Sequence, residues 1–415
     1  MASRLFSPAR QGEGGPPLSG PAYSDRAMTA AATFERVSPH LPAFGITRLG
    51  RLTGLDTIGI PVWQAVSPNA RSIVIHHGKG ITDIDAKVSA AMEALERAFA
   101  ACPAAPGLTA SRSALAARGL ASDPMPALIA RGEHDIGREE EIAWLAGRDL
   151  IGGSPVHVPR DSVLLDRTLG RRRFWQSSDG LASGNTLDEA LLHGLLERIE
   201  RDAEMLWMVS DVPTQLRACV DPTAFGDAVL DRLAAMVEDA GFALRLFDVT
   251  SDVGIPVIAA QLAPRAALQR RTAHFVEVTG GCGAHPSPAR AAIRAVTEAA
   301  QSRLTFISGA RDDIAPETYD RLLPAEIRAR FEAVPGRLPT ESLAGPLPGD
   351  AGALLEMVVD RLRDAQVGPS IAVPLSDPAL PFAVAKLLVP GLENPEGARK
   401  RRFGVRALAK SLALP

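Results

Sequence analysis

The sequence predicts a mixed α/β fold with several sheets and packed helices. The main observation is a unit that occurs three times in the 415 residues: an extended segment, a glycine-rich stretch and a helix with a capping residue at its start. Further strand and helix patterns lie between and after these units. A chain of this length can bury a large core, and length alone favours two or three folding units.

The first unit begins with residues 72–77 (SIVIHH), an apolar run typical of a strand. Gly78 and Gly80 then indicate a turn. Thr82 follows as the expected N-cap of a helix over residues 82–101, because Asp85 stands three residues later at the capping-box position.

The second unit repeats this order. Residues 172–177 (RRFWQS) are expected to be extended, and residues 180–185 to form a loop. Thr186 then caps a helix over residues 186–207, with Glu189 three residues further on.

The third unit has the same plan. Residues 272–278 alternate in the manner of a strand, and residues 280–283 (GGCG) are expected to turn. Ser287 is the expected N-cap of a helix over residues 287–307, with Pro288 at the first helical position.

The rest of the chain supplies supporting elements and connections. Strands are expected at 242–249, 256–262 and 382–389, helices at 224–240 and 352–365, and connections over 104–126 and 310–350. Residues 1–28 are rich in Gly, Pro and Ser, so we expect a tail, with the ordered chain beginning near Phe34. Residues 29–415 are then one catalytic domain.

Composition excludes several classes of protein. With 46% hydrophobic residues, 22% charged residues and a net charge of −3, the chain lacks the basic balance of a non-specific nucleic-acid or membrane-surface binder. Cys102, Cys219 and Cys282 are far apart and form no CxxC pair, which indicates a reducing compartment. No apolar run is long enough for a signal peptide or a membrane span, so we expect a cytoplasmic protein.

The three predicted helices share one polar register. An acid stands four residues after the first polar group, and a second acid or amide follows three residues later. Residues three and four apart share a helix face, so each helix presents a compact polar cluster. The clusters are Ser89/Glu93/Glu96/Arg97, His193/Glu197/Glu200/Arg201 and Arg294/Glu298/Gln301.

Each pair of acids taken alone fits a solvated helix face. Three copies in matching register, each after a glycine-rich stretch, favour a shared ligand instead. Carboxylates gathered with arginines suit a magnesium-bound polyphosphate, because Mg²⁺ prefers carboxylate and phosphate oxygens and guanidinium groups bind phosphate. We therefore predict a Mg-ATP site whose metal ligands come from Glu93, Glu96, Glu197, Glu200 and Glu298.

Lys79 and the histidines are less decisive. The segment around Lys79 does not match the phosphate-loop signature, because Ile73 and Gly80 occupy positions that require Gly and Ser or Thr. A phosphate contact by Lys79 and a plain turn therefore both stay open. His193 lies in register with the acids, but a structural pairing with Glu197 explains it equally well.

At these residues the chain resembles the YcaO family, from about residue 45 to residue 401. The matching segments are Gly78-Lys-Gly80 with Ser89-x-x-x-Glu93-x-x-Glu96-Arg97, Gly180-Leu-Ala-Ser-Gly-Asn185-Thr186 with Glu197-x-x-Glu200-Arg201-Asp202, Gly283-Ala-His-Pro286 with Arg294-x-x-x-Glu298-x-x-Gln301-x-Arg303, and Val389-Pro-Gly-Leu-Glu393.

The resemblance implies an ATP-dependent enzyme that acts on a backbone amide of a peptide or protein substrate. In the family, helix-borne acids bind magnesium and ATP, the amide oxygen receives the terminal phosphoryl group, and a nucleophile adds at the amide carbon. The implied nucleotide ligands are Lys79, Ser89, Glu93, Glu96, Arg97, Asn185, Glu197, Glu200, Arg201, Arg294, Glu298 and Gln301. The resemblance identifies no catalytic side chain.

The branch of the family is indicated by other segments. Residues 45–71 and 309–313 are similar to members that pair with a TfuA-type protein and form thioamides. Azoline-forming members commonly end in Pro-x-Pro-x-Pro, whereas this chain ends in KSLALP. Thioamide formation is therefore favoured over azoline formation. A nucleotide-binding scaffold without activity, a TfuA-like partner and a homodimer stay open.

Overall fold

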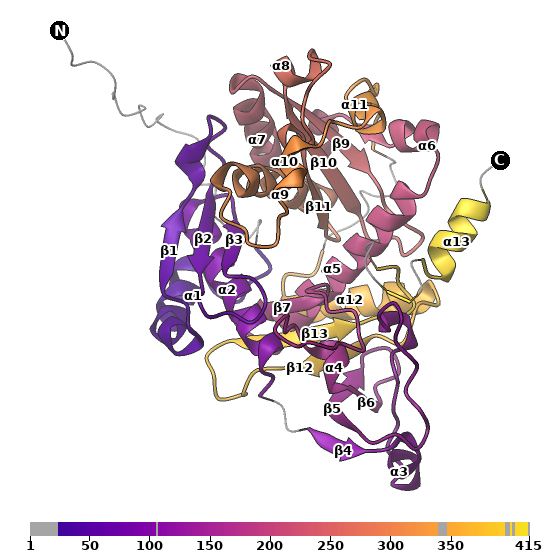
Figure 1. Cartoon of the computed structure of the whole chain (residues 1–415). Coiled ribbons are helices and arrows are strands. Elements are labelled where there is room, and N and C mark those ends of the chain that lie inside the picture. Colours follow the sequence, from indigo (N-terminus) through magenta and orange to yellow (C-terminus); the bar gives the residue numbers. More distant parts are fainter. Residues whose placement is uncertain (1–23, 105–106, 339–346, 395–398, 401–402, 414–415) are drawn as a thin grey trace.

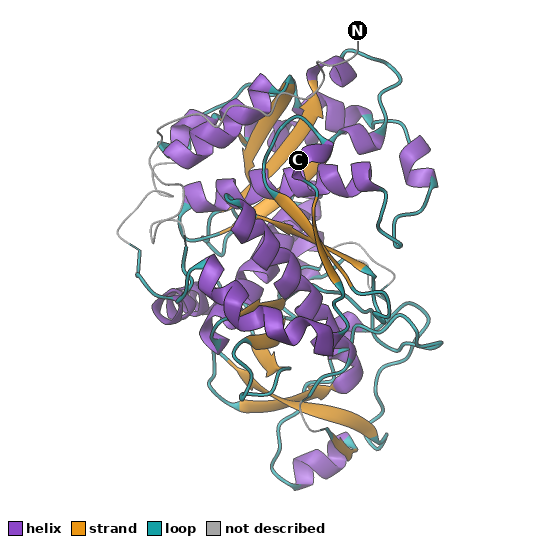
Figure 2. Ribbon diagram, turned by 90° about the vertical axis from the view of Figure 1, so that its left-hand side faces the viewer, coloured by secondary structure: helices purple, strands orange, loops and turns teal. Residues whose placement is uncertain are grey.

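The computed structural model describes residues 24–104, 107–338, 347–394, 399–400 and 403–413. Its named strands form three sheets, and every pairing between them is antiparallel (Figure 1). In the perpendicular view, the strands lie in separate groups with helices packed between them (Figure 2). The expected mixed α/β fold is confirmed.

The first sheet has the order β1-β2-β3, and its strands are β1 (Arg48–Arg51), β2 (Val62–Val66) and β3 (Ile75–Lys79). Helix α2 (Asp83–Ala101) follows β3 and packs back on β3 and β2. The short helices α1 (Ala30–Val37) and η2 (Ser38–Phe44) lie against α2. This sheet therefore places the first acidic helix.

The second sheet has the order β4-β5-β12-β13-β7, with β6 paired to β5. Its strands are β4 (Leu108–Ala110), β5 (Ile142–Asp149), β6 (Pro155–Pro159), β7 (Leu181–Gly184), β12 (Ile371–Pro374) and β13 (Ala383–Leu388). Helix α5 (Leu187–Met208) packs on β7 and β13, and α12 (Ala351–Asp364) packs on α5. Leu195, Leu196 and Ile199 of α5 are buried in an apolar cluster with Leu354 and Leu387.

The third sheet has the order β11-β10-β9-β8. Its strands are β8 (Cys219–Val220), β9 (Phe242–Asp248), β10 (Val257–Pro264) and β11 (Thr279–Ala284). Helix α9 (Pro288–Ser308) packs on β11 and β10, and α7 (Ala228–Asp239) packs on β9.

Shorter elements occupy the connections. They are η3 (Thr53–Leu55), α3 (Arg112–Ala117), η4 (Pro126–Leu128), α4 (Arg160–Val163), α6 (Val212–Arg217), η5 (Pro222–Phe225), α8 (Arg265–Leu268), η6 (Phe275–Glu277), α10 (Glu317–Asp320), α11 (Ala325–Arg330) and α13 (Val405–Leu412). Among the described helices, none has both the length and the apolar composition needed to cross a membrane.

The three long helices also contact one another's sheets in a cyclic order. Helix α2 touches β7, α5 touches β11, and α9 touches β3, in addition to the strand that precedes each helix. Three units that are far apart in the sequence therefore surround one region. The caps expected at Thr82, Thr186 and Ser287 are all present, so the starts of these helices were correctly predicted.

Two expected strands are wrong. Residues 172–177 contain no strand and make only a bridge between Phe174 and Ile129, and residues 272–278 contain η6. The glycine-rich segments that were expected to turn are instead the strands β7 and β11. In the first unit the strand likewise extends through Gly78 to Lys79.

The reason is the close approach of each strand to the helix that follows. A Cβ atom on Gly78 would overlap with the backbone of Ala86 and Ala90 in α2, and one on Gly281 would overlap with the backbone of Ala295 in α9. Fully buried alanines on the helices complete these contacts. Glycine is therefore needed here for space and not for a turn.

This packing predicts a large effect at one glycine and a small effect at its neighbour. We expect Gly281→Ala to lower the free energy of unfolding by about 1–3 kcal/mol, because the added methyl group forces strand and helix apart. Gly280→Ala is the matched control, since its Cβ atom would meet nothing closer than 3.6 Å. Chemical denaturation measures both, and equal stabilities would contradict the proposed contact.

Candidate active site

A cavity of about 1250 Å³ lies where α2, α5 and α9 meet. Every residue that the sequence predicted as a nucleotide or metal ligand lines it. These residues are Lys79, Ser89, Glu93, Glu96, Arg97, Asn185, Glu197, Glu200, Arg201, Arg294, Glu298 and Gln301. The matching register of the three helices therefore corresponds to one shared space and not to three separate surfaces.

On α2, each of the two acids has a polar partner. Arg97 Nε lies 3.3 Å from Glu93 Oε1. The hydroxyl of Ser183, on β7, donates a hydrogen bond of 2.6 Å to Glu96 Oε1. The first acidic cluster is therefore attached to the second unit of the chain.

On α5, Arg201 lies among five carboxylates. Its guanidinium nitrogens are 3.3 Å from Glu204, 3.6 Å from Glu200, and 4.0 Å from Glu197, Glu298 and Asp179. The cation offsets the repulsion that these acids would otherwise exert on one another in a poorly solvated space.

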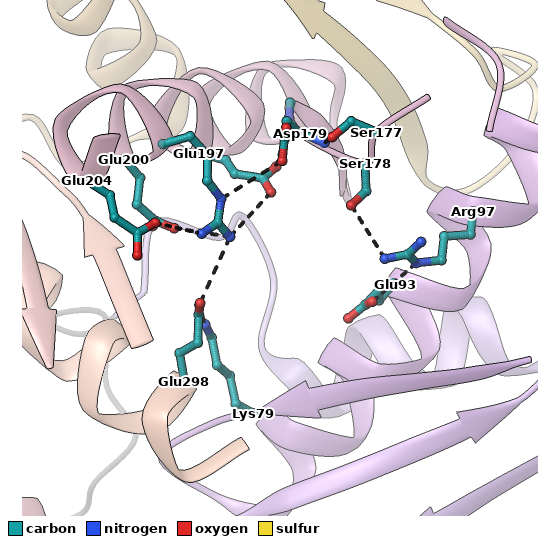
Figure 3. Close-up of polar contacts among 12 residues, drawn as sticks. Lys79, Glu93, Arg97, Ser177, Ser178, Asp179, Glu197, Glu200, Glu204 and Glu298 are labelled. Carbon is teal, nitrogen blue, oxygen red and sulfur yellow. Dashed lines mark hydrogen bonds and ion pairs between the residues drawn. The ribbon is translucent and has the colours of Figure 1, made fainter. Parts of the chain in front are cut away.

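On α9, Glu298 also pairs with Lys79 at the end of β3, so that one carboxylate contacts cations from two other units (Figure 3). Arg294 Nη1 lies 3.3 Å from His193 Nδ1 on α5. The Gln301 amide donates to the carbonyl of His77 at 3.3 Å. The question left open for Lys79 is thus answered in part: it ends a strand and faces the site.

Burial has marked effects on the acids. It raises the pKa of Glu96 to about 8, with the nearby charges of Glu93 and Glu197 adding to the increase. Burial also raises the pKa of Glu200 to about 8 and the pKa of Glu197 above its usual value. For Glu298 the burial is outweighed by Lys79 and Arg201, so its pKa is lowered.

The geometry of the site does not by itself assign an acid–base role to the histidines. Burial, with Arg294 nearby, lowers the pKa of His193 well below its usual value. Burial also lowers the pKa of His76 to about 3 and of His77 to about 4. All three are therefore neutral at pH 7. Cys282 is buried in β11, in agreement with a packing role.

The carboxylates fit a metal carried on phosphate better than a metal held by protein alone. Within the described residues, no three His, Cys, Asp or Glu side chains are grouped closely enough to bind a metal by themselves. Mg²⁺ characteristically takes one or two carboxylates and completes its shell with water and substrate phosphates. Buried carboxylates with raised pKa values, facing a large cavity, suit that role.

Some residues of the site were not singled out from the sequence. Ser183 donates a hydrogen bond to Glu96, Asp179 lies near Arg201, and Lys386 donates to the carbonyl of Ser177. Ser183 belongs to the glycine-containing segment 180–186, and Asp179 directly precedes it. Asn185 was predicted, but its side chain is held by Glu189 at 3.1 Å and by Thr33 at 2.9 Å.

The segment 24–28 was assigned to the tail, but it is part of the described fold and lines the cavity. Asp25 accepts hydrogen bonds from His285 Nε2 at 2.9 Å and Arg290 at 2.5 Å. Arg26 donates to the carbonyl of Ser183 at 3.0 Å and to Glu189 at 3.2 Å. Composition does not reveal these contacts, because they involve only two residues of the segment, Asp25 and Arg26. The remainder of the expected tail, residues 1–23, lies outside the described residues.

Comparison with known proteins identifies the family. A family model described as YcaO cyclodehydratase, ATP- and Mg²⁺-binding, matches residues 77–393. The chain belongs to the YcaO family. A protein of Rhizobium leguminosarum bv. trifolii, described as uncharacterized and located in the tfuA 3′ region, is 41% identical over 391 residues that cover 93% of each chain.

More distant relatives agree. A protein of Methanothermobacter thermautotrophicus is 32% identical over 91% of this chain and 98% of its own length. YcaO from Methanopyrus kandleri, bound with AMPPCP and Mg²⁺, superposes with a TM-score of 0.68 at 23% identity, covering 88% of this chain and 92% of that one. A heterocyclase in complex with substrate and cofactor has a TM-score of 0.72 at 21% identity, over 89% of this chain and 53% of that one.

These comparisons give the cofactors at the level of the family. YcaO proteins bind ATP and Mg²⁺, so ATP and Mg²⁺ are the cofactors of this chain. The structural likenesses show a shared fold. The roles of individual residues of this chain stay predictions.

The raised pKa values predict that binding of Mg²⁺ with nucleotide releases protons. At about pH 7.5, Glu96 and Glu200 are largely protonated in the free protein because their pKa values are about 8, and a metal-bound carboxylate must lose its proton. Affinity should therefore rise with pH up to about 8. Calorimetry in two buffers of different ionisation enthalpy should give different heats.

Glu96→Gln is the variant that checks the source of these protons. It keeps the size of the side chain but has no titrating group, so the buffer dependence should decrease. The same heat in both buffers for the wild-type protein would contradict the assignment of raised pKa values to acids that bind the metal, as predicted for Glu96 and Glu200.

The contacts of segment 24–28 predict different results for two deletions. Removing residues 1–23 keeps Asp25 and Arg26, so stability and nucleotide binding should be unchanged. Removing residues 1–28 deletes their charge-assisted hydrogen bonds, which should lower the free energy of unfolding by about 1–3 kcal/mol and weaken nucleotide binding. Denaturation and Mg-AMPPCP titration test this. Identical behaviour of the two deletions would show that the segment is dispensable.

Proposed function

We propose that this protein is an ATP-dependent enzyme that converts a backbone amide of a peptide into a thioamide. The observation that supports this proposal most strongly is that three acidic helices and their cations converge on one cavity. The acids Glu93, Glu96, Glu197, Glu200 and Glu298 would hold magnesium on the phosphates. Lys79, Arg201 and Arg294 would neutralise phosphate charge.

In this proposal the chain supplies positioning and charge, and no protein nucleophile takes part. ATP supplies the phosphoryl group that converts the amide oxygen into a leaving group. Cations fixed by carboxylates around the cavity stabilise charge as it moves to the leaving phosphate. The neutral histidines agree with such a role for the protein, because proton transfer by imidazolium is not needed for it.

The size of the cavity supports a second substrate beside the nucleotide. Pockets for single small ligands are on the order of 300–1,000 Å³. The cavity of about 1250 Å³ exceeds that range. Its lining includes residues of the loop after α9, such as Arg311 and Ile314, which are not among the predicted nucleotide ligands. A peptide strand lying along this side would bring its amide to the nucleotide.

The proposal that sulfur is the incoming atom rests on the similarity of this chain to its relatives. The relative that is 41% identical lies in the tfuA 3′ region, which supports a TfuA-type partner for this chain as well. The segments 45–71 and 309–313 have the same resemblance. Formation of an azoline from a Cys, Ser or Thr of the substrate is the alternative within the same chemistry.

Mass spectrometry separates the two products. With peptide, Mg-ATP, a sulfide source and the partner, thioamide formation should increase the peptide mass by about 16 Da, because sulfur replaces the oxygen that leaves as phosphate. Azoline formation would decrease it by about 18 Da through loss of water. A decrease with no labelled sulfide incorporated would overturn the thioamide proposal. Glu200→Gln is the control and should reduce formation of either product.

A further inference from the structure

The segment 177–180 connects the two helices that carry most of the acids. The Ser178 hydroxyl accepts a hydrogen bond of 3.4 Å from Arg97 on α2. The backbone N–H of Gly180 donates to Glu197 Oε2 on α5 at 3.0 Å. The Asp179 carboxylate lies 4.0 Å from Arg201. Figure 3 shows Ser177, Ser178 and Asp179 between Arg97 and Glu197, so this segment bridges the two acidic clusters.

Lys386 holds this segment from behind. It stands on β13, next to β7, where it pairs with Leu181. Its side chain is buried, and Nζ donates a hydrogen bond of 2.6 Å to the carbonyl of Ser177. The nearby charges of Asp179 and Glu197 favour the ammonium form, although burial lowers the pKa of Lys386 to about 8.

Burying the ammonium group of Lys386 in β13 has a free-energy cost that needs an explanation. The residues on the same face of β13, Val384 and Leu388, are buried and apolar, as is Leu181 opposite on β7. Moving an ammonium group into such surroundings costs several kcal/mol unless it is paired and hydrogen-bonded. An apolar residue at this position would therefore stabilise the sheet more than lysine does. What the ammonium adds is its hydrogen bond to the segment 177–180 and its charge behind the acids.

The surroundings make the segment dependent on this hydrogen bond. A small cavity of about 20 Å³ lies behind it, lined by Ser177, Asp179, Arg198, Lys386 and Asn394 among others. A space of that size holds about one water molecule. Without the ammonium, the carbonyl of Ser177 can move into this space, and Gly180 and Ser178 move with it.

We propose that Lys386 is a positioning residue for the magnesium-nucleotide site. Its ammonium group fixes the carbonyl of Ser177, which places the Gly180 N–H on Glu197 and the Ser178 hydroxyl at Arg97. The inference rests on the proposed function, because it takes Glu197 as a ligand of the magnesium-nucleotide complex. It adds a residue that acts through the backbone and makes no contact with the nucleotide.

Binding of AMPPCP with and without Mg²⁺ tests the proposal in the full chain. Lys386→Met removes the donor while keeping the length of the side chain. It should weaken Mg-dependent binding about 10–100-fold, as loss of a group that orients metal ligands does. Lys386→Arg keeps a cationic donor, and the adjoining cavity leaves room for the guanidinium, so binding should largely return. Lys386→Gln, with a neutral donor, replaces K386M in the comparison if that variant does not fold.

Arg330→Met is the matched control. Arg330 is another buried cation, and it donates a hydrogen bond of 2.8 Å to Gln215. The carboxylates whose charges act on it, Glu204 and Glu326, are not among the five predicted magnesium ligands. This variant should lower the melting temperature and leave Mg-AMPPCP affinity unchanged.

Wild-type affinity in a folded K386M variant would overturn the proposal. A folded K386R variant that binds no better than K386M would also overturn it, because a cationic donor would then not be what the site requires. Failure of the proposed function is distinguishable: the wild-type chain itself would then bind no Mg-AMPPCP, or would give a peptide product with a different mass change.

Discussion

Direct contact between the backbone of a helix and the glycine of the strand before it determines the geometry of this protein. At Gly78 and Gly281 no side chain separates strand from helix. Each helix is thereby held close to its sheet, and the polar residues on its adjoining face are aimed past the strand into the central cavity. Because α2, α5 and α9 each also touch a strand of another unit, the three contacts are arranged in a ring.

The second constraint is electrostatic. Five acids share a cavity in which burial raises the pKa of three of them, Glu96, Glu197 and Glu200. Arg201 lies among the acids of α5 and α9, and Lys79 pairs with Glu298 from a third element. Cations from one unit thus compensate acids from another. A magnesium-bound polyphosphate, the ligand proposed for this cavity, would supply both a positive metal for the acids and negative oxygens for the arginines.

Around this centre, short segments without regular structure carry much of the organisation. Asp25 and Arg26 attach the start of the described chain to α9, β7 and α5. The segment 177–180 joins α2 to α5, and Lys386 holds it from the sheet. Such segments are where substrate-binding groups are generally placed, since loops can vary while the scaffold that holds them stays rigid.

The sequence by itself determined the class of fold, the starts of the three long helices and twelve of the residues that line the cavity. Those features depend on local chemistry: a capping hydroxyl at Thr82, or acids spaced three and four residues apart on one helix face. Tertiary structure decided the rest. Residues 181–184 and 280–283 are in strands, against local expectation, because their glycines pack directly against the helix that follows, and the local sequence does not reveal that contact. Likewise, the partners of Arg201 and the contacts of Asp25 join residues up to 265 positions apart in the chain, and only packing of the three units brings such residues together.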